Sequence, residues 1–370
     1  MASGAFTDSG VNTMSMWRLR GRIGWGIFAV LVIVVIVRLM LPGWVADYLN
    51  KQLDEMGEYH GAVADVELHL WRGAYSLNDL SIEKRSGEIP APLLSAPRVD
   101  ISVAWKALFH GAVVATVAFE SPEINFVDVP GKGGGQSGGG VDWRAELESI
   151  IPIRLDEVDI RDGRIHFRNF DSNPPVDLQA THVDGVIRNL SNIRDPDART
   201  ASFDLTARIL GGAPLVSSAS FDPLGTLRDF SFALKVTGVE LTRANDFLQA
   251  YAKVDAEKGK GDFVMELTAR NGTLDGYAKP LFHDVQIFSW EHDVEKQRDN
   301  PLRAAWEIVV GGIQQLFKNQ SQDQFATRVA IHGSIDNKEI SAWDAVLGIL
   351  RNAFIEAYRP TFEKLPEKPD

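Results

Sequence analysis

The amino-acid sequence predicts a mainly β protein: a single N-terminal transmembrane helix, then a long curved antiparallel β-sheet with a few accessory helices. One observation is an uncharged apolar run, residues 23–37, which has no counterpart in the rest of the 370 residues. The other is a two-residue alternation of apolar and polar side chains that recurs after it, as in strands with one buried face. The sheet forms either an open groove or a closed β-sandwich, and alternation does not distinguish them.

The first element is a membrane anchor over residues 23–41. Its uncharged part runs from Ile23 to Val37, and Arg38 can extend to the headgroups from near the helix end. The preceding segment, residues 1–22, carries three arginines against one acid. Because positive charge stays on the cytoplasmic side, this tail is predicted to be cytoplasmic and the rest of the chain translocated. A cleaved signal peptide is the alternative, but no clean small-x-small site follows the run.

Strands and turns account for most of the remaining sequence. Asp-Gly and Asn-Gly pairs separate the alternating segments, which indicates that the sheet is built strand after strand. Helical spacing is confined to a few short patterns. One pattern follows Pro42, one runs from Trp143 to Ile150, and one begins at Thr242. Two longer ones cover residues 301–318 and 342–358.

A glycine-rich segment, residues 131–140, divides the sheet region into parts 42–130 and 141–370. Its composition predicts a flexible loop. It contains a single lysine, Lys132, which lies between glycines rather than before the Ser or Thr that opens a helix in a phosphate-binding loop. A nucleotide site is therefore not predicted.

Nothing in the sequence forms a recognisable catalytic or metal-binding pattern. The chain has no cysteine, and its eight histidines are dispersed without metal-ligand spacing. The net charge of −12 argues against a nucleic-acid partner. We expect no enzymatic activity, no cofactor and no metal. Paired carboxylates acting on a glycan are the enzymatic alternative, although no pair is selected by the sequence.

An open groove would have an apolar lining. With ~4.8 Å between strands, about a dozen strands would give a groove on the order of 60 Å long, which suits acyl chains better than a compact polar substrate. The candidate lining residues, chosen by the face they occupy, are Val66, Leu68, Leu70, Val99, Ile101, Val103, Phe203 and Leu205.

The segment 63–75 resembles the N-terminal signature of AsmA-like proteins, in the branch with an LxLWRGAY motif. The motif positions are Leu70, Trp71, Arg72, Gly73 and Tyr75. Further similar stretches follow in order at 102–108, 188–190, 245–251, 276–282 and 351–354. The resemblance adds no catalytic residue.

This resemblance implies a single-pass protein of the bacterial inner membrane whose periplasmic part is similar to chorein-type lipid-transfer proteins. It implies phospholipid binding or transfer that supports outer-membrane lipid homeostasis. A structural envelope protein whose sheet is internally packed, and which binds a protein partner, is the alternative from another functional class.

Overall fold

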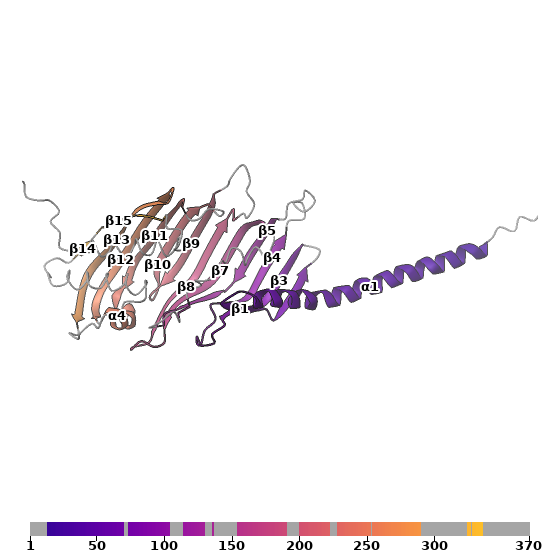
Figure 1. Ribbon diagram of the computed structural model, residues 1–370, viewed down its shortest axis with the longest axis horizontal. Coiled ribbons are helices and arrows are strands. Elements are labelled where there is room, and N and C mark those ends of the chain that lie inside the picture. The colour runs from indigo at the N-terminus through magenta and orange to yellow at the C-terminus, as the bar shows by residue number, and fades with distance from the viewer. Residues whose placement is uncertain are drawn as a thin grey trace, which may run out of the picture.

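The computed structural model describes residues 13–69, 73–103, 114–129, 135–136, 154–190, 200–222, 228–252, 254–289, 324–326 and 328–335. In this part of the chain all fifteen strands belong to one sheet. Figure 1 shows a single curved layer with one long helix leaving its N-terminal end. The prediction of a mainly β protein with an apolar N-terminal helix is confirmed. No second sheet stacks on the first among the described residues, so these strands do not form the alternative closed sandwich.

Helix α1 (Thr13–Asp54) contains the predicted anchor. Residues 28–54 include a stretch long and apolar enough to cross a membrane, and none of that stretch is buried in the protein. Arg38 lies exposed within it. The helical pattern predicted after Pro42 is present as the last part of α1, which continues through that proline without interruption.

The strands differ widely in length, from three to seventeen residues. The N-terminal strands are β1 (Tyr59–Ala62), β2 (Asp65–His69), β3 (Ala74–Lys84), β4 (Leu94–Val103), β5 (Val114–Glu120), β6 (Glu123–Val127), β7 (Arg154–Asn169) and β8 (Val176–Arg188). They are followed by β9 (Ala201–Ile209), β10 (Ala213–Phe221), β11 (Phe230–Glu240), β12 (Val254–Arg270), β13 (Thr273–Ser289), β14 (Gln324–Ala326) and β15 (Val329–Ser334).

Strand β7 departs from the predicted antiparallel sheet. It pairs in parallel with both β5 and β6, whereas the other pairs are antiparallel. The sheet is therefore mixed. A parallel pair needs a long crossover connection, and the segment between β6 and β7, residues 128–153, is long enough to supply one. Side-chain alternation does not depend on strand direction, so it could not predict this.

A line of residues with positive φ crosses the N-terminal half of the sheet. Asp79, Ser121, Asp162 and His182 have φ between 48° and 53°. The strand registers place them in one row across the sheet, on β3, just after β5, and on β7 and β8, with β4 between the first two. The backbone N–H of Asp162 donates to Asp184 Oδ1 at 3.0 Å. Since such irregularities bend strands locally, this line accounts for part of the curvature.

A short helical segment connects β11 to β12. The predicted helix near Thr242 is present, as a 3₁₀ turn η2 (Leu241–Ala244) followed by α4 (Asn245–Ala252). The Asn245 side chain bonds both the N–H and the C=O of Ala256 on β12, at 2.9 and 3.0 Å. The ring of Phe247 meets that of Phe167 on β7 edge to face, with centroids 6.0 Å apart. α4 therefore reaches from β12 to β7 and β8. The other predicted helices, at 143–150, 301–318 and 342–358, lie outside the described residues.

Two residues of the predicted flexible loop are described, and both lie against β6. The backbone of Gln136 pairs with Val127, and its side chain donates to the carbonyl of Asn125 at 2.9 Å. Lys84 Nζ donates to the carbonyl of Gly135 at 2.8 Å. At this point the glycine-rich segment 131–140 is attached to the sheet.

Candidate functional site

Two rows of directly paired residues cross one face of the sheet and are apolar almost throughout. We call them the first and second ladders; each takes one residue from each of twelve strands. The first ladder is Leu68, Tyr75, Ile101, Val117, Val158, Ile187, Phe203, Ala219, Phe232, Leu267, Gly276 and Ile331. The second is Val66, Leu77, Val99, Phe119, Ile160, Gly185, Leu205, Ser217, Leu234, Met265, Ala278 and Val329. Neither contains a charged residue.

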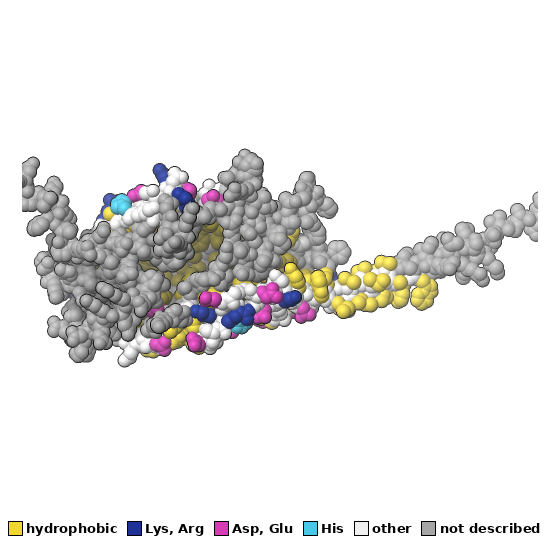
Figure 2. All heavy atoms as spheres, in the orientation of Figure 1, with side chains coloured by type: hydrophobic (Ala, Val, Ile, Leu, Met, Phe, Trp, Pro, Cys, Tyr) yellow, Lys and Arg dark blue, Asp and Glu magenta, His cyan; other side chains and the backbone are white. Residues whose placement is uncertain are grey.

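This apolar face is hollowed. Figure 2 shows hydrophobic side chains at the bottom of a recess in the middle of the molecule, with charged side chains along its rims. Eleven spacings of ~4.8 Å give a ladder of about 53 Å. The predicted apolar sheet face is thus continuous in space, although it joins residues from strands far apart in the sequence.

The opposite face of the N-terminal strands is polar. Arg98 Nε lies 2.9 Å from Asp100 Oδ1, and Arg98 also reaches Glu67 at 3.4 Å. Ser76 Oγ bonds both Asp100 and Arg98. A hydrogen bond from Asn78, together with the Arg98 charge, holds the pKa of the Glu67 carboxyl below its usual value. The sheet therefore has one water-compatible face and one face that avoids water.

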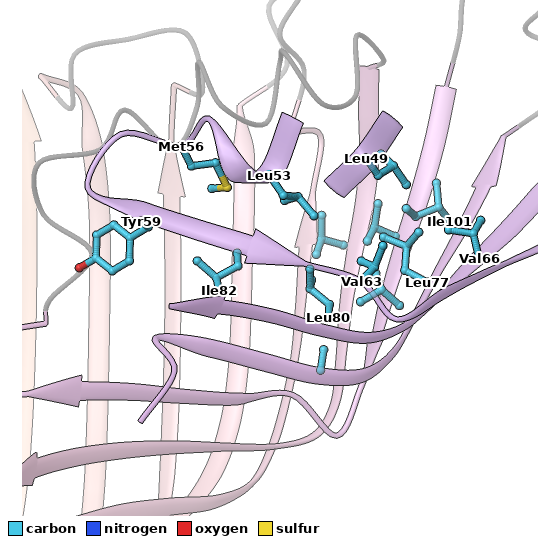
Figure 3. Packing of buried hydrophobic residues seen from close by; sticks show 14 of the residues in the cluster. Leu49, Leu53, Met56, Tyr59, Val63, Val66, Leu77, Leu80, Ile82 and Ile101 are labelled. Carbon is cyan, nitrogen blue, oxygen red and sulfur yellow. The ribbon is translucent and has the colours of Figure 1, made fainter. Parts of the chain in front are cut away.

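The C-terminal end of α1 covers the apolar face at its N-terminal end. Leu49 and Leu53 of α1, and Met56 in the turn after it, are almost fully buried in one cluster with residues of β2, β3 and β4, as Figure 3 shows. Two hydrogen bonds of Asn50 stabilise this contact. Its Oδ1 accepts from the N–H of Val63 at 2.7 Å, and its Nδ2 donates to the C=O of Val63 at 3.2 Å. These strands and the helix form one hydrophobic core.

Five predicted lining residues belong to this core. Val66, Val99 and Ile101 are 1–2% exposed. Leu68 and Val103 are half-buried and pack against the same cluster. These five residues lie on one face of the sheet, and side chains of α1 pack against that face here. The sequence could not show the covering, because it depends on where α1 ends in space.

The other two described candidates, Phe203 and Leu205, lie in the middle of the ladders and are half-buried. Three large apolar residues that follow them in the ladders, on β11 and β12, were not selected from the sequence. These are Phe232, Leu234 and Met265, which are half-buried on the same face. Alternation placed each on one face of its strand, but only the register shows that they share the two ladders with Phe203 and Leu205.

The family-motif positions are divided. Leu70, Trp71 and Arg72 lie outside the described residues. Gly73 has φ +61°, a backbone conformation suited to glycine. Tyr75 lies in the first ladder between Leu68 and Ile101, and burial raises the pKa of its hydroxyl.

Among the residues that the structure describes, no group of three or more His, Asp or Glu side chains could hold a metal ion. No protein-family model matches the chain, and no curated protein matches its sequence. What the protein does must therefore be argued from the geometry of the apolar face and the helix beside it.

Proposed function

We propose that this chain is an AsmA-like protein that binds or transfers phospholipid along the apolar face of its sheet. The observation that carries the proposal is the pair of uncharged ladders crossing twelve strands, on a sheet whose other face is charged. An acyl chain makes no hydrogen bonds, so it matches a surface that offers only apolar contacts. A polar substrate would leave its own groups unpaired there.

The burial pattern supports a ligand. Phe203, Phe232 and Leu234 are half-buried, so their apolar surface remains partly accessible. Covering apolar surface is worth roughly 25 cal/mol per Å², and the gain adds along a row of such residues. Monomeric soluble proteins seldom expose a large contiguous apolar patch without a functional reason.

The position of α1 supports a membrane source for the lipid. The helix can cross a bilayer and packs directly on the first strands of the sheet. With the arginine-rich tail in the cytoplasm, the sheet would lie in the periplasm of a bacterium with two membranes. The function would then be lipid exchange at the inner membrane in support of the outer one.

Site-specific photo-crosslinking in intact membranes tests the proposal. Phe203 in the full chain is replaced by the photoreactive p-benzoylphenylalanine, which keeps an aromatic ring at this half-buried position. The matched control places the same residue at Val216, which is on β10 but on the opposite face and 53% exposed. Phospholipid adducts at 203 but not at 216 would support lipid binding. Equal yields, or no lipid at 203, would contradict it.

A further inference from the structure

Exposure varies along the first ladder. At its N-terminal end Ile101, Val117 and Val158 are buried, and at its C-terminal end Leu267 and Ile331 are buried. Between them the ladder residues on β8, β9, β10 and β11 are all half-buried. Leu68 and Tyr75, at the N-terminal end, are half-buried as well, but they pack against the hydrophobic core that contains Leu49 and Leu53 of α1. Phe203, Ala219 and Phe232 do not belong to that core, so the half-buried stretch away from α1 lies in the middle of the ladder.

At the N-terminal end of the ladder, α1 packs on the first strands, and its buried residues share one hydrophobic core with Ile101, Val117 and Val158. Leu49 and Leu53 occupy the apolar face where a lipid would otherwise lie. The two hydrogen bonds between Asn50 and Val63 fix the helix there. Burial also raises the pKa of Tyr75, which agrees with a dry environment at this end of the ladder.

Helix α4 lies across the ends of the middle strands. α4 contacts β8 and β12, the strands on either side of β9, β10 and β11. Its Leu248 is buried with Ala256, and Leu210 in the turn between β9 and β10 packs against them. α4 therefore lies at one side of the half-buried stretch, whereas α1 covers the apolar face at the first strands.

The length of the stretch matches one lipid. From Ile187 on β8 to Met265 on β12 there are four strand spacings, or about 19 Å. One leaflet of a bilayer has a hydrocarbon layer of about 15 Å, half of the ~30 Å core. A chain lying across these strands would contact Phe203, Leu205 and Leu234 and would then reach buried protein at either end.

We propose that the half-buried stretch from β8 to β12 is a discrete acyl-chain site that holds one phospholipid at a time, sealed from the first strands by the end of α1. The inference rests on the proposed lipid-binding function and makes it more specific. A continuous conduit would hold several lipids along the ~53 Å ladder, whereas this geometry fits a carrier.

The test compares crosslinking positions along one ladder in the full chain. p-Benzoylphenylalanine replaces Phe203, Phe232 or Tyr75, each an aromatic residue that is half-buried. We expect lipid adducts at 203 and 232, and a yield at least about tenfold lower at 75. A chain carrying the photoreactive residue at both 203 and 232 should gain the mass of a single phospholipid.

Two outcomes would overturn the inference while leaving lipid binding intact. One is a yield at 75 equal to that at 203, which would mean that the groove is open at its N-terminal end. The other is a doubly substituted chain that gains two lipid masses in proportion to the single yields. Absence of adducts at all three positions would instead overturn the proposed function, and the inference with it.

Discussion

Replacing Phe203 by Asp should remove the lipid without unfolding the protein. Full burial of a Phe side chain is worth about 1.5–3 kcal/mol, and Phe203 is half-buried, so the fold should lose roughly 1 kcal/mol. The lipid loses its contact with the ring and would have to cover a carboxylate, which costs at least a further ~2 kcal/mol. Because 1.4 kcal/mol is a factor of ten in affinity, the affinity for the lipid should fall by about a hundredfold.

Two matched variants make this result interpretable. Ile101→Asp lies on the same ladder but at a site 2% exposed; a charge in that core should destabilise the protein by several kcal/mol, a large part of a typical stability. Val216→Asp is exposed on the other face and should change neither property. Lipid would be measured by mass spectrometry of the full chain in nanodiscs, and folding by resistance to proteolysis. Undiminished lipid in Phe203→Asp, or equal loss in Val216→Asp, would refute the reasoning.

The remaining predictions concern residues that stabilise the sheet and its contact with α1. Asn50→Ala should speed hydrogen exchange at the Val63 amide and cost about 2 kcal/mol, because two backbone groups lose their partners. Asn50→Asp keeps the acceptor for the Val63 N–H but places an oxygen against the Val63 carbonyl, so it should slow exchange relative to Asn50→Ala without restoring the parent stability. Gly276→Ala should lower the unfolding temperature, since its Cβ would collide with the β12 backbone, and an unchanged temperature would contradict that packing. The lowered pKa of Glu67 stabilises the folded state above the ordinary carboxyl pKa, and this stabilisation is lost as pH falls through the lowered value. Glu67→Gln should therefore be less stable than the parent at neutral pH, and the difference should shrink below about pH 4 in acid titrations of unfolding.

The sequence predicts the faces of individual strands well and their neighbours poorly. Alternation assigned Val66, Ile101 and Phe203 to one apolar face, and the registers place them in the two ladders. Alternation could not distinguish Val66 and Ile101, which form a core with α1, from Phe203, which remains half-buried. That difference depends on where one helix ends and packs, a long-range contact with no local pattern. The parallel pairing of β7 was missed for a different reason: strand direction leaves the alternation of side chains unchanged.

The continuity of α1 determines how the sheet relates to the bilayer, if the helix spans it. Pro42 has no N–H, so the carbonyl of Arg38 lacks its helical donor; this is tolerated where headgroups and water can supply one. The packing of α1 on the sheet begins at Val45, four residues after Leu41, which is about 6 Å of helix. The first strands would therefore lie at the headgroup layer, with no flexible linker between. Figure 1 shows the later strands following one another away from that end.

The half-buried stretch begins at β8, five strand spacings or about 24 Å along the sheet from β2. Under the proposed function, a lipid that left the bilayer could not reach this stretch by following the apolar face, because Leu49, Leu53 and Met56 occupy that path. Loading would require either that α1 lifts from the first strands or that lipid enters across a long edge of the sheet. The hydrogen bonds of Asn50 oppose the first route and leave the second unaffected. Faster loading in Asn50→Ala would therefore identify α1 as the gate, whereas an unchanged rate would indicate entry across the edge.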